Sequence, residues 1–195
     1  MNNIAHYISE IFIVLDRVHS TIWLKARAVW WGVKLGEQCK AQGRVYFKRR
    51  QNSSIIIGKG CCFSSRSTSN AMGLYCPCMF TTREKGAEIR IGDNCGFSGV
   101  RMRADLNVII GNNVRCGANV LISDTDAHAE DPRAGKNAPV VIEDNVWVGM
   151  NVMVLKGVHI GKNSVIGAGS VVTRDIPANV MAAGVPCKVI KELSV

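Results

Sequence analysis

The sequence predicts a parallel β-helix, an all-β fold in which short strands coil around a narrow interior. The main observation is that an aliphatic residue recurs at every sixth position, six times without a break, from Ile142 to Val172. Helices repeat at about 3.6 residues and strands at about 2, so neither produces this period. A second observation is the glycine that often follows the aliphatic residue, as at Gly149 and Gly161, where the chain turns a corner. Repeats of six residues that each form one flat side of a coil explain both.

Composition indicates which residues fill the interior of such a coil and in which cellular compartment the protein is found. Apolar residues make up 47% of the 195 residues but aromatic residues only 6%, so we expect a core of Val, Ile, Ala and Cys rather than of rings. The eight cysteines do not form a disulfide pattern, and Cys116 falls on an inward position. No secretory signal and no apolar stretch of membrane-spanning length is found. We therefore expect a cytoplasmic protein.

Residues 1–33 lack the sixfold period and predict an α-helical appendage. Apolar residues recur there at spacings of three and four, the pattern of an amphipathic helix, and tryptophans alternate with basic residues near its end. Residues 1–50 carry nine Lys and Arg against three acidic residues, which is +6 of the total charge of +9. Two interpretations stay open: a peripheral helix at an anionic membrane surface, or a helix that packs on the open end of the coil and hides its edge strand. Nucleic-acid binding is not expected, because the charge comes without an aromatic-basic motif on the repeats.

The repeats begin near residue 34, and we assign residues 34–185 to the β-helix and residues 186–195 to a C-terminal tail. Two intervals break the register. The 34 residues from Ile57 to Ile91 predict nearly two coils with an irregular middle, from Ser64 to Thr82. The 20 residues from Ile122 to Ile142 predict a loop over 123–140.

The loop over 123–140 is the strongest candidate for chemistry. It holds His128 among four carboxylates, and a histidine held in one tautomer can act as a general base near neutral pH. We expect Asp126 to orient His128, with Glu130 as the alternative. His6 and His19 belong to the predicted helix, and His159 lies in a regular repeat.

Three segments carry a resemblance to a known family. They read IEDNVWVG over 142–149, IGAGSVVTRDIP over 166–177 and AAGVPCKVI over 182–190. They resemble the hexapeptide-repeat acyltransferases, and are most similar to the galactoside and maltose O-acetyltransferases and the bacterial polysaccharide O-acetyltransferases. The resemblance is strong over 86–192, moderate over 34–85 and absent from the N-terminal helix. It implies a left-handed β-helix, a homotrimer with active sites between neighbouring subunits, and acetyl-CoA as co-substrate without a metal.

The resemblance also implies roles for individual residues. His128 would take the proton from an acceptor hydroxyl that attacks the thioester directly, and the backbone N–H of Met150 would stabilise the oxyanion. Serine is frequent in the family at the position of Met150, and an asparagine that holds the sugar stands in the galactoside enzymes where this chain has Ser98. Asp124 is a second candidate on the acceptor side. The residues expected along the cofactor are Trp147, Met150, Ala168, Thr173, Arg174, Lys188 and Lys191.

The function expected from these observations is an acetyl-CoA-dependent O-acetyltransferase that acts on a sugar hydroxyl, in surface polysaccharide or glycan biosynthesis. Two alternatives remain: an N-acyltransferase of an amino sugar or nucleotide-linked amino sugar, and a xenobiotic acetyltransferase. A γ-class carbonic anhydrase shares the coil but needs three histidines to hold zinc, and only His128 is suitably placed.

Overall fold

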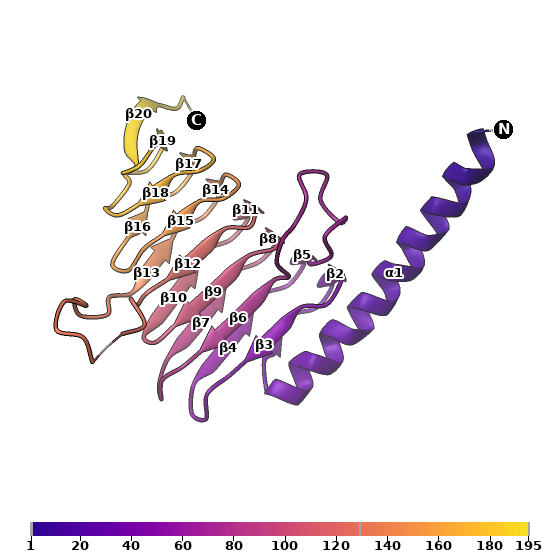
Figure 1. Cartoon of the computed structure of the whole chain (residues 1–195), viewed down its shortest axis with the longest axis horizontal. Helices are drawn as coiled ribbons and strands as arrows, with labels where there is room; N and C mark the ends of the chain where they lie inside the picture. The colour runs from indigo at the N-terminus through magenta and orange to yellow at the C-terminus, as the bar shows by residue number, and fades with distance from the viewer. Residues whose placement is uncertain (1, 129, 195) are drawn as a thin grey trace.

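The computed structural model describes residues 2–128 and 130–194 and consists of a three-sided β-helix with one long helix at its N-terminal end (Figure 1). Successive strands along the chain belong to three different sheets, and strands one coil apart pair in parallel. The predicted β-helix fold is therefore confirmed.

Each sheet forms one side of the coil. Sheet A contains β1 (Lys34–Leu35), β4 (Ser54–Ile57), β7 (Glu88–Ile91), β10 (Asn107–Ile110), β13 (Val140–Ile142) and β16 (His159–Ile160). Sheet B contains β2 (Lys40–Gln42), β5 (Cys62–Ser64), β8 (Gly96–Ser98), β11 (Arg115–Ala118), β14 (Trp147–Val148), β17 (Val165–Ile166), β19 (Val180–Ala183) and β20 (Lys188–Glu192). Sheet C contains β3 (Tyr46–Lys48), β6 (Met79–Thr82), β9 (Arg101–Ala104), β12 (Leu121–Ser123), β15 (Met153–Val154) and β18 (Val171–Val172).

The sixfold aliphatic residues form buried columns along the coil axis. In sheet A, Ile91 pairs with Ile110, and Ile110 pairs with Ile142. All three side chains are at most 2% exposed. Because each inward residue contacts its equivalents in the coils above and below, the sixfold register is maintained by burial of apolar surface.

The corner between sheets A and B has the same backbone geometry in successive coils. Residues in the left-handed backbone region stand there in successive coils, with φ of 57° at Asn113, 59° at Asn145 and 60° at Asn163. Asparagine tolerates this region better than other residues with a side chain. The Asn145 side-chain amide also donates to the Asn163 side-chain carbonyl at 3.1 Å. The corner therefore repeats from coil to coil without an insertion.

The interval between Ile57 and Ile91 is one coil, not the two predicted. Ile57 pairs directly with Ile91 in adjacent strands of sheet A. The additional length forms a long loop over 65–78 that joins sheet B to sheet C (Figure 1). The prediction was wrong because a length of 34 residues fits two coils of eighteen almost as well as one coil with a loop.

The expected absence of rings from the core was also wrong. Phe47, Phe63, Phe80 and Phe97 are each at most 2% exposed. Phe63 and Phe97 stack with ring centroids 5.7 Å apart, and Phe80 meets Phe63 edge-on at the same distance. The aromatic residues are few in the whole chain but are concentrated in the N-terminal coils, where they fill the interior.

Helix α1 (Asn2–Trp31) ends at Gly32 and packs only its C-terminal half on the coil. Gly32 has φ of 61°, and the N–H of Val33 donates to the Ala28 carbonyl at 2.8 Å, the pattern of a Schellman cap. The hydroxyl groups of Ser20 and Thr21 accept the N–H groups of Gly43 and Ala41, at 2.9 and 3.1 Å. Helix side chains thus accept hydrogen bonds from otherwise unpaired backbone N–H groups in and next to β2, the edge strand of sheet B.

The N-terminal half of α1 extends away from the coil (Figure 1). Its apolar stripe is exposed, with Ile8 48%, Phe12 66% and Leu15 59% accessible. Among the described residues, no helix has both the length and the apolar character needed to span a membrane.

The C-terminal residues return along sheet B rather than adding another coil. β20 pairs antiparallel with β19, with Lys191 beside Met181 and Lys188 beside Ala183. The parallel stacking therefore ends at β19, and an antiparallel strand forms this edge of the sheet. The assignment of 34–185 and 186–195 to separate segments stays a prediction.

We predict that Phe80→Ala lowers the free energy of unfolding by about 3–5 kcal/mol, because it removes a buried ring and leaves a cavity among its phenylalanine neighbours. Chemical denaturation followed by far-UV circular dichroism measures this change. The control is Met79→Ala, since Met79 is the neighbouring outward residue and is 41% exposed. Equal losses for the two variants would contradict the aromatic core.

Candidate active site

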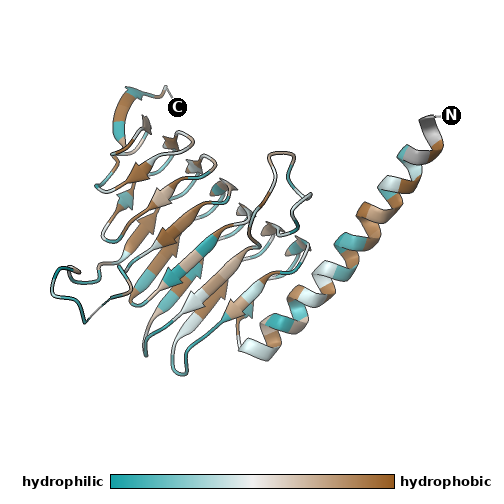
Figure 2. Cartoon of the chain, in the orientation of Figure 1, coloured by the Kyte–Doolittle hydropathy of each residue, from teal (hydrophilic) through white to brown (hydrophobic). Residues whose placement is uncertain are grey.

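The loop over 123–140 leaves the coil at the corner between sheets C and A, where it connects β12 to β13. It projects from the side of the prism and is predominantly hydrophilic (Figure 2). Its turns are held locally: Thr125 Oγ1 accepts the N–H of Ala127 at 3.0 Å, and Ala127 has φ of 70°. A positive φ is uncommon for a residue other than glycine. Where it does occur, it is often at a functional site.

His128 is exposed at the outer part of this loop. Its side chain is 73% accessible, and its Nδ1 lies 3.4 Å from Oε1 of Glu130. A hydrogen bond from the Glu130 backbone N–H and the contact with His128 lower the pKa of the Glu130 carboxyl. Glu130 is therefore ionised at neutral pH and can hold the Nδ1–H tautomer of His128. That tautomer leaves Nε2 free to accept a proton.

Asp126 does not contact His128 and instead binds Lys156. The Lys156 ammonium donates to Oδ2 of Asp126 at 2.5 Å and to the carbonyl of Gly135 at 2.9 Å. His128 instead contacts Glu130, the alternative named from the sequence, and which carboxylate orients His128 stays a prediction. Lys156 was not identified from the sequence, because it stands in a regular repeat with nothing to distinguish it from a surface lysine.

Asp124 is inside the protein rather than on an acceptor-binding surface. It is fully buried, and its carboxylate accepts the backbone N–H groups of Asp105 at 2.8 Å and Leu106 at 2.6 Å. Burial raises the pKa of the Asp124 carboxyl, and these hydrogen bonds oppose that rise. The expected acceptor contact is corrected on this ground: both carboxylate oxygens are engaged in joining two neighbouring coils.

Ser98, Met150 and Ala168 lie at the corner between sheets B and C. Backbone hydrogen bonds connect this corner from coil to coil: Asn119 N–H to Ser98, Asn151 N–H to Ala118, and Gly169 N–H to Met150, at 2.9, 2.8 and 2.8 Å. The candidate acceptor residue and two candidate cofactor residues therefore share one corner. Within the described chain the Met150 N–H makes no hydrogen bond.

The loop over 65–78 covers the same corner. Asn70 donates from its side-chain amide to the Ser98 hydroxyl at 3.1 Å. The Tyr75 N–H donates to the Asn119 side chain at 3.2 Å, and the Tyr75 hydroxyl lies 3.4 Å from Oδ1 of Asn151. From the sequence, this irregular stretch could either complete an acceptor pocket or form a structural bulge. Its hydrogen bond places it beside Ser98.

The remaining candidate residues are distributed over two sides of the prism. Trp147 is 59% exposed on β14, and Lys188 and Lys191 are exposed on β20 of the same sheet. Thr173 and Arg174 follow β18, at the corner between sheets C and A from which the His128 loop also emerges. Both residues are exposed.

The candidate residues thus occupy two different corners of one prism. His128, Thr173 and Arg174 belong to the corner between sheets C and A, and Ser98, Met150 and Ala168 to the corner between sheets B and C. Sheet C separates the two groups.

Two buried thiols, those of Cys78 and Cys116, are unsuited to act as nucleophiles. Burial raises the pKa of the Cys78 thiol to about 11, and burial also raises the pKa of Cys116. A thiol is reactive as the thiolate. Neither of these two thiols is therefore suited to form a covalent intermediate.

Comparisons with known proteins support the resemblance seen in the sequence. Residues 139–174 match the family model described as bacterial transferase hexapeptide (six repeats). A galactoside O-acetyltransferase of Escherichia coli (strain K12) is 47% identical over 115 residues, which are 56% of each chain. A 2,3,4,5-tetrahydropyridine-2,6-dicarboxylate N-acetyltransferase of Staphylococcus aureus (strain Newman) is 44% identical over 84 residues, which are 43% of this chain and 33% of that protein.

A solved galactoside acetyltransferase in complex with coenzyme A has a similar structure. It is 32% identical, with a TM-score of 0.52, over 83% of this chain and 65% of that one. The predicted resemblance to hexapeptide-repeat acyltransferases and the left-handed β-helix are confirmed by these findings. The chain spans about half the length of the curated galactoside relatives that it matches.

We predict that Lys156→Met loosens the His128 loop, because Lys156 joins both limbs of the loop through Asp126 and Gly135. Limited proteolysis with trypsin, followed by mass spectrometry, measures cleavage after Arg133 and Lys136. The rate is expected to rise about tenfold, which corresponds to about 1.4 kcal/mol of lost closure free energy. Lys162→Met is the matched control on a regular coil, and an increase of the same size there would contradict the role of Lys156.

Proposed function

We propose, from the resemblance to hexapeptide-repeat acetyltransferases, that this chain transfers an acetyl group from acetyl-CoA to a sugar hydroxyl. The observation that carries the proposal is the exposed His128 beside Glu130, on a loop that departs from an otherwise regular coil. A cytoplasmic enzyme of surface polysaccharide or glycan biosynthesis is the role that we infer for it.

The proposal includes a homotrimer with the active site between two subunits. The separation of the candidate residues over two corners of the prism supports this arrangement. One subunit would contribute His128, and its neighbour would contribute Met150 and the loop over 65–78. A complete site would then exist only in the assembly.

His128 acts as the general base in the proposed reaction. Its Nε2 accepts the proton of the acceptor hydroxyl as the hydroxyl oxygen forms a bond to the thioester carbonyl carbon. The Met150 N–H donates to the oxyanion, and a fixed donor of this kind typically contributes about 3 kcal/mol to catalysis. When the carbon–sulfur bond breaks, the His128 proton passes to the thiolate, so that the base is restored.

The co-substrate is assigned to the C-terminal coils. Trp147 and Ala168 of one subunit would offer apolar surface for the pantetheine arm, and Thr173 and Arg174 of its neighbour would lie along it. Lys188 and Lys191 on β20 supply positive charge for the phosphates. Lysine attracts a phosphate as a point charge and lacks the paired N–H groups of arginine.

The acceptor is assigned to Ser98 and Asn70 at the neighbouring corner. Their mutual hydrogen bond orients a hydroxyl and an amide, groups that are suited to the hydroxyls of a sugar. An N-acetyltransferase activity on an amino sugar is the alternative, and the N-acetyltransferase relative, 44% identical over 84 residues, supports transfer to nitrogen. Mass spectrometry of the product before and after treatment with alkaline hydroxylamine separates the two, because the treatment cleaves an ester and leaves an amide intact.

We predict that His128→Ala lowers kcat/KM for acetyl transfer by about 10²–10⁴, because general-base catalysis is lost while binding remains. Release of free thiol from acetyl-CoA, measured over a panel of glycans, reports the activity. Light scattering verifies that the variant is still a trimer. The control is His159→Ala, which removes a histidine that pairs with Glu143 on a regular coil. Wild-type activity in the His128 variant would exclude this role.

We also propose that the apolar stripe of α1 contacts a membrane surface. Exposure of Ile8 and Phe12 beside a basic N-terminal quarter supports this contact. Ile8→Glu/Phe12→Glu is expected to lower cosedimentation with anionic vesicles at least fivefold without unfolding the coil, since neither residue packs on it. The control, Glu10→Gln, changes a polar residue in the same turns. Unchanged sedimentation of the double variant would instead favour contacts of α1 with another protein surface.

A further inference from the structure

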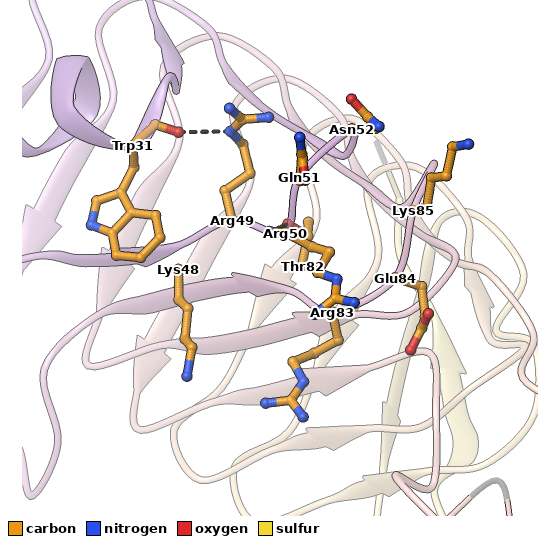
Figure 3. Close-up of a pocket in the computed structure, with 10 residues that line it drawn as sticks. All are labelled: Trp31, Lys48, Arg49, Arg50, Gln51, Asn52, Thr82, Arg83, Glu84 and Lys85. Carbon is orange, nitrogen blue, oxygen red and sulfur yellow. Dashed lines mark hydrogen bonds between the residues drawn. The ribbon is translucent and has the colours of Figure 1, made fainter.

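A basic concavity lies at the corner between sheets C and A, toward the N-terminal end of the coil (Figure 3). It has a volume of about 740 Å³ and is formed by the turn after β3, the turn after β6 and the end of α1. Five of its ten lining residues are cationic and one is acidic. The lining residues are Trp31, Lys48, Arg49, Arg50, Gln51, Asn52, Thr82, Arg83, Glu84 and Lys85.

The cations of this concavity are not neutralised by the protein. In the described ranges 2–128 and 130–194, no ion pair involves Lys48, Arg50 or Arg83. Glu84 is the single carboxylate that lines the space. Bringing like charges together is unfavourable without a counter-charge, so the concavity attracts an anion.

Arg49 holds one wall of the concavity in place. Its Nε donates to the Trp31 carbonyl at 2.6 Å and its Nη1 donates to the Ser53 carbonyl at 2.7 Å. These bonds fix the turn after β3 against the end of α1. The neighbouring Arg50 is free to point outward, and Figure 3 shows Lys48 and Arg83 extending to the same side.

A second, smaller concavity lies next to the first along sheet C. It has a volume of about 310 Å³, shares Lys48 and Arg83 with the first, and adds Arg101 together with Arg103, which is paired with Asp105. Lys48, Thr81, Arg103 and Ser123 occupy equivalent positions on successive strands of sheet C. Ser123 is the residue at which the His128 loop begins.

The geometry points to a binding site for a phosphate or pyrophosphate group in this basic concavity, and we propose that it anchors a phosphorylated ligand on the His128 side of the molecule. Guanidinium groups bind phosphate oxygens in pairs, which suits Arg50 and Arg83. Parallel strands lie about 4.8 Å apart, so the turn after β6 is about 10 Å from the base of the His128 loop, two strands away. A phosphate held there would leave an attached sugar within reach of that loop; this last step rests on the proposed function.

Titration calorimetry with inorganic pyrophosphate at physiological salt tests the site. The full chain is expected to bind saturably, and Arg50→Gln/Arg83→Gln is expected to raise Kd at least tenfold. Arg49 is retained, because its hydrogen bonds are structural. The matched control is Lys59→Gln/Lys162→Gln, which removes the same charge at the corner between sheets A and B and is expected to leave Kd within twofold.

A second arm identifies the source of the phosphate. Vesicles of phosphatidylcholine, with and without phosphatidic acid, are sedimented with the unchanged protein, the arginine double variant and the lysine control. Saturable pyrophosphate binding that is lost in the arginine variant supports a soluble phosphorylated ligand. Binding only to the phosphatidic acid vesicles, lost in the same variant, supports a lipid headgroup. Binding to neither probe, or an equal loss in the lysine control, overturns the proposal.

None of these measurements requires acetyl transfer. An inactive protein that binds pyrophosphate would therefore contradict the proposed function and leave this site standing.

Discussion

Coil-to-coil hydrogen bonding is the constraint on which the whole structure depends. Each strand is only two to five residues long, and such a strand has no stability alone. It exists because its N–H and carbonyl groups pair with the strands of the coils above and below. The inward side chains must then stack in register, because a shift by one residue would turn the aliphatic column outward. Backbone pairing and side-chain burial therefore select the same arrangement.

This constraint also explains where the chemistry is placed. The flat sides of the coil repeat and offer few special positions, so distinctive groups gather at the corners and in the loops that leave them. The two long loops leave different corners, one next to Ser98 and one with His128 at its outer part. The rigid prism between them fixes their separation within one molecule, and an assembly with a neighbour can bring such corners together.

The sequence predicted the regular parts of the fold well and the irregular parts poorly, for a physical reason. The column from Ile142 to Val172 was clear because every repeat meets the same steric requirement. The interval before Ile91 was misjudged because length alone does not distinguish a second coil from a loop. His128 and its loop were identified from the break in register. The pairing of Asp126 with Lys156, and the burial of Asp124, depend on how the loop folds back, which no local pattern encodes.

The uninterrupted asparagine corner has a consequence for how this scaffold can change. Both long insertions occur at the other two corners, whereas the corner between sheets A and B has no insertion, and its Asn145, Asn163 and Asn179 side chains are hydrogen-bonded in series. A segment inserted there would break this series of side-chain hydrogen bonds, whereas each of the other two corners already accommodates a long loop. New recognition loops are therefore expected at two of the three corners of the prism, while the corner between sheets A and B stays free of insertions.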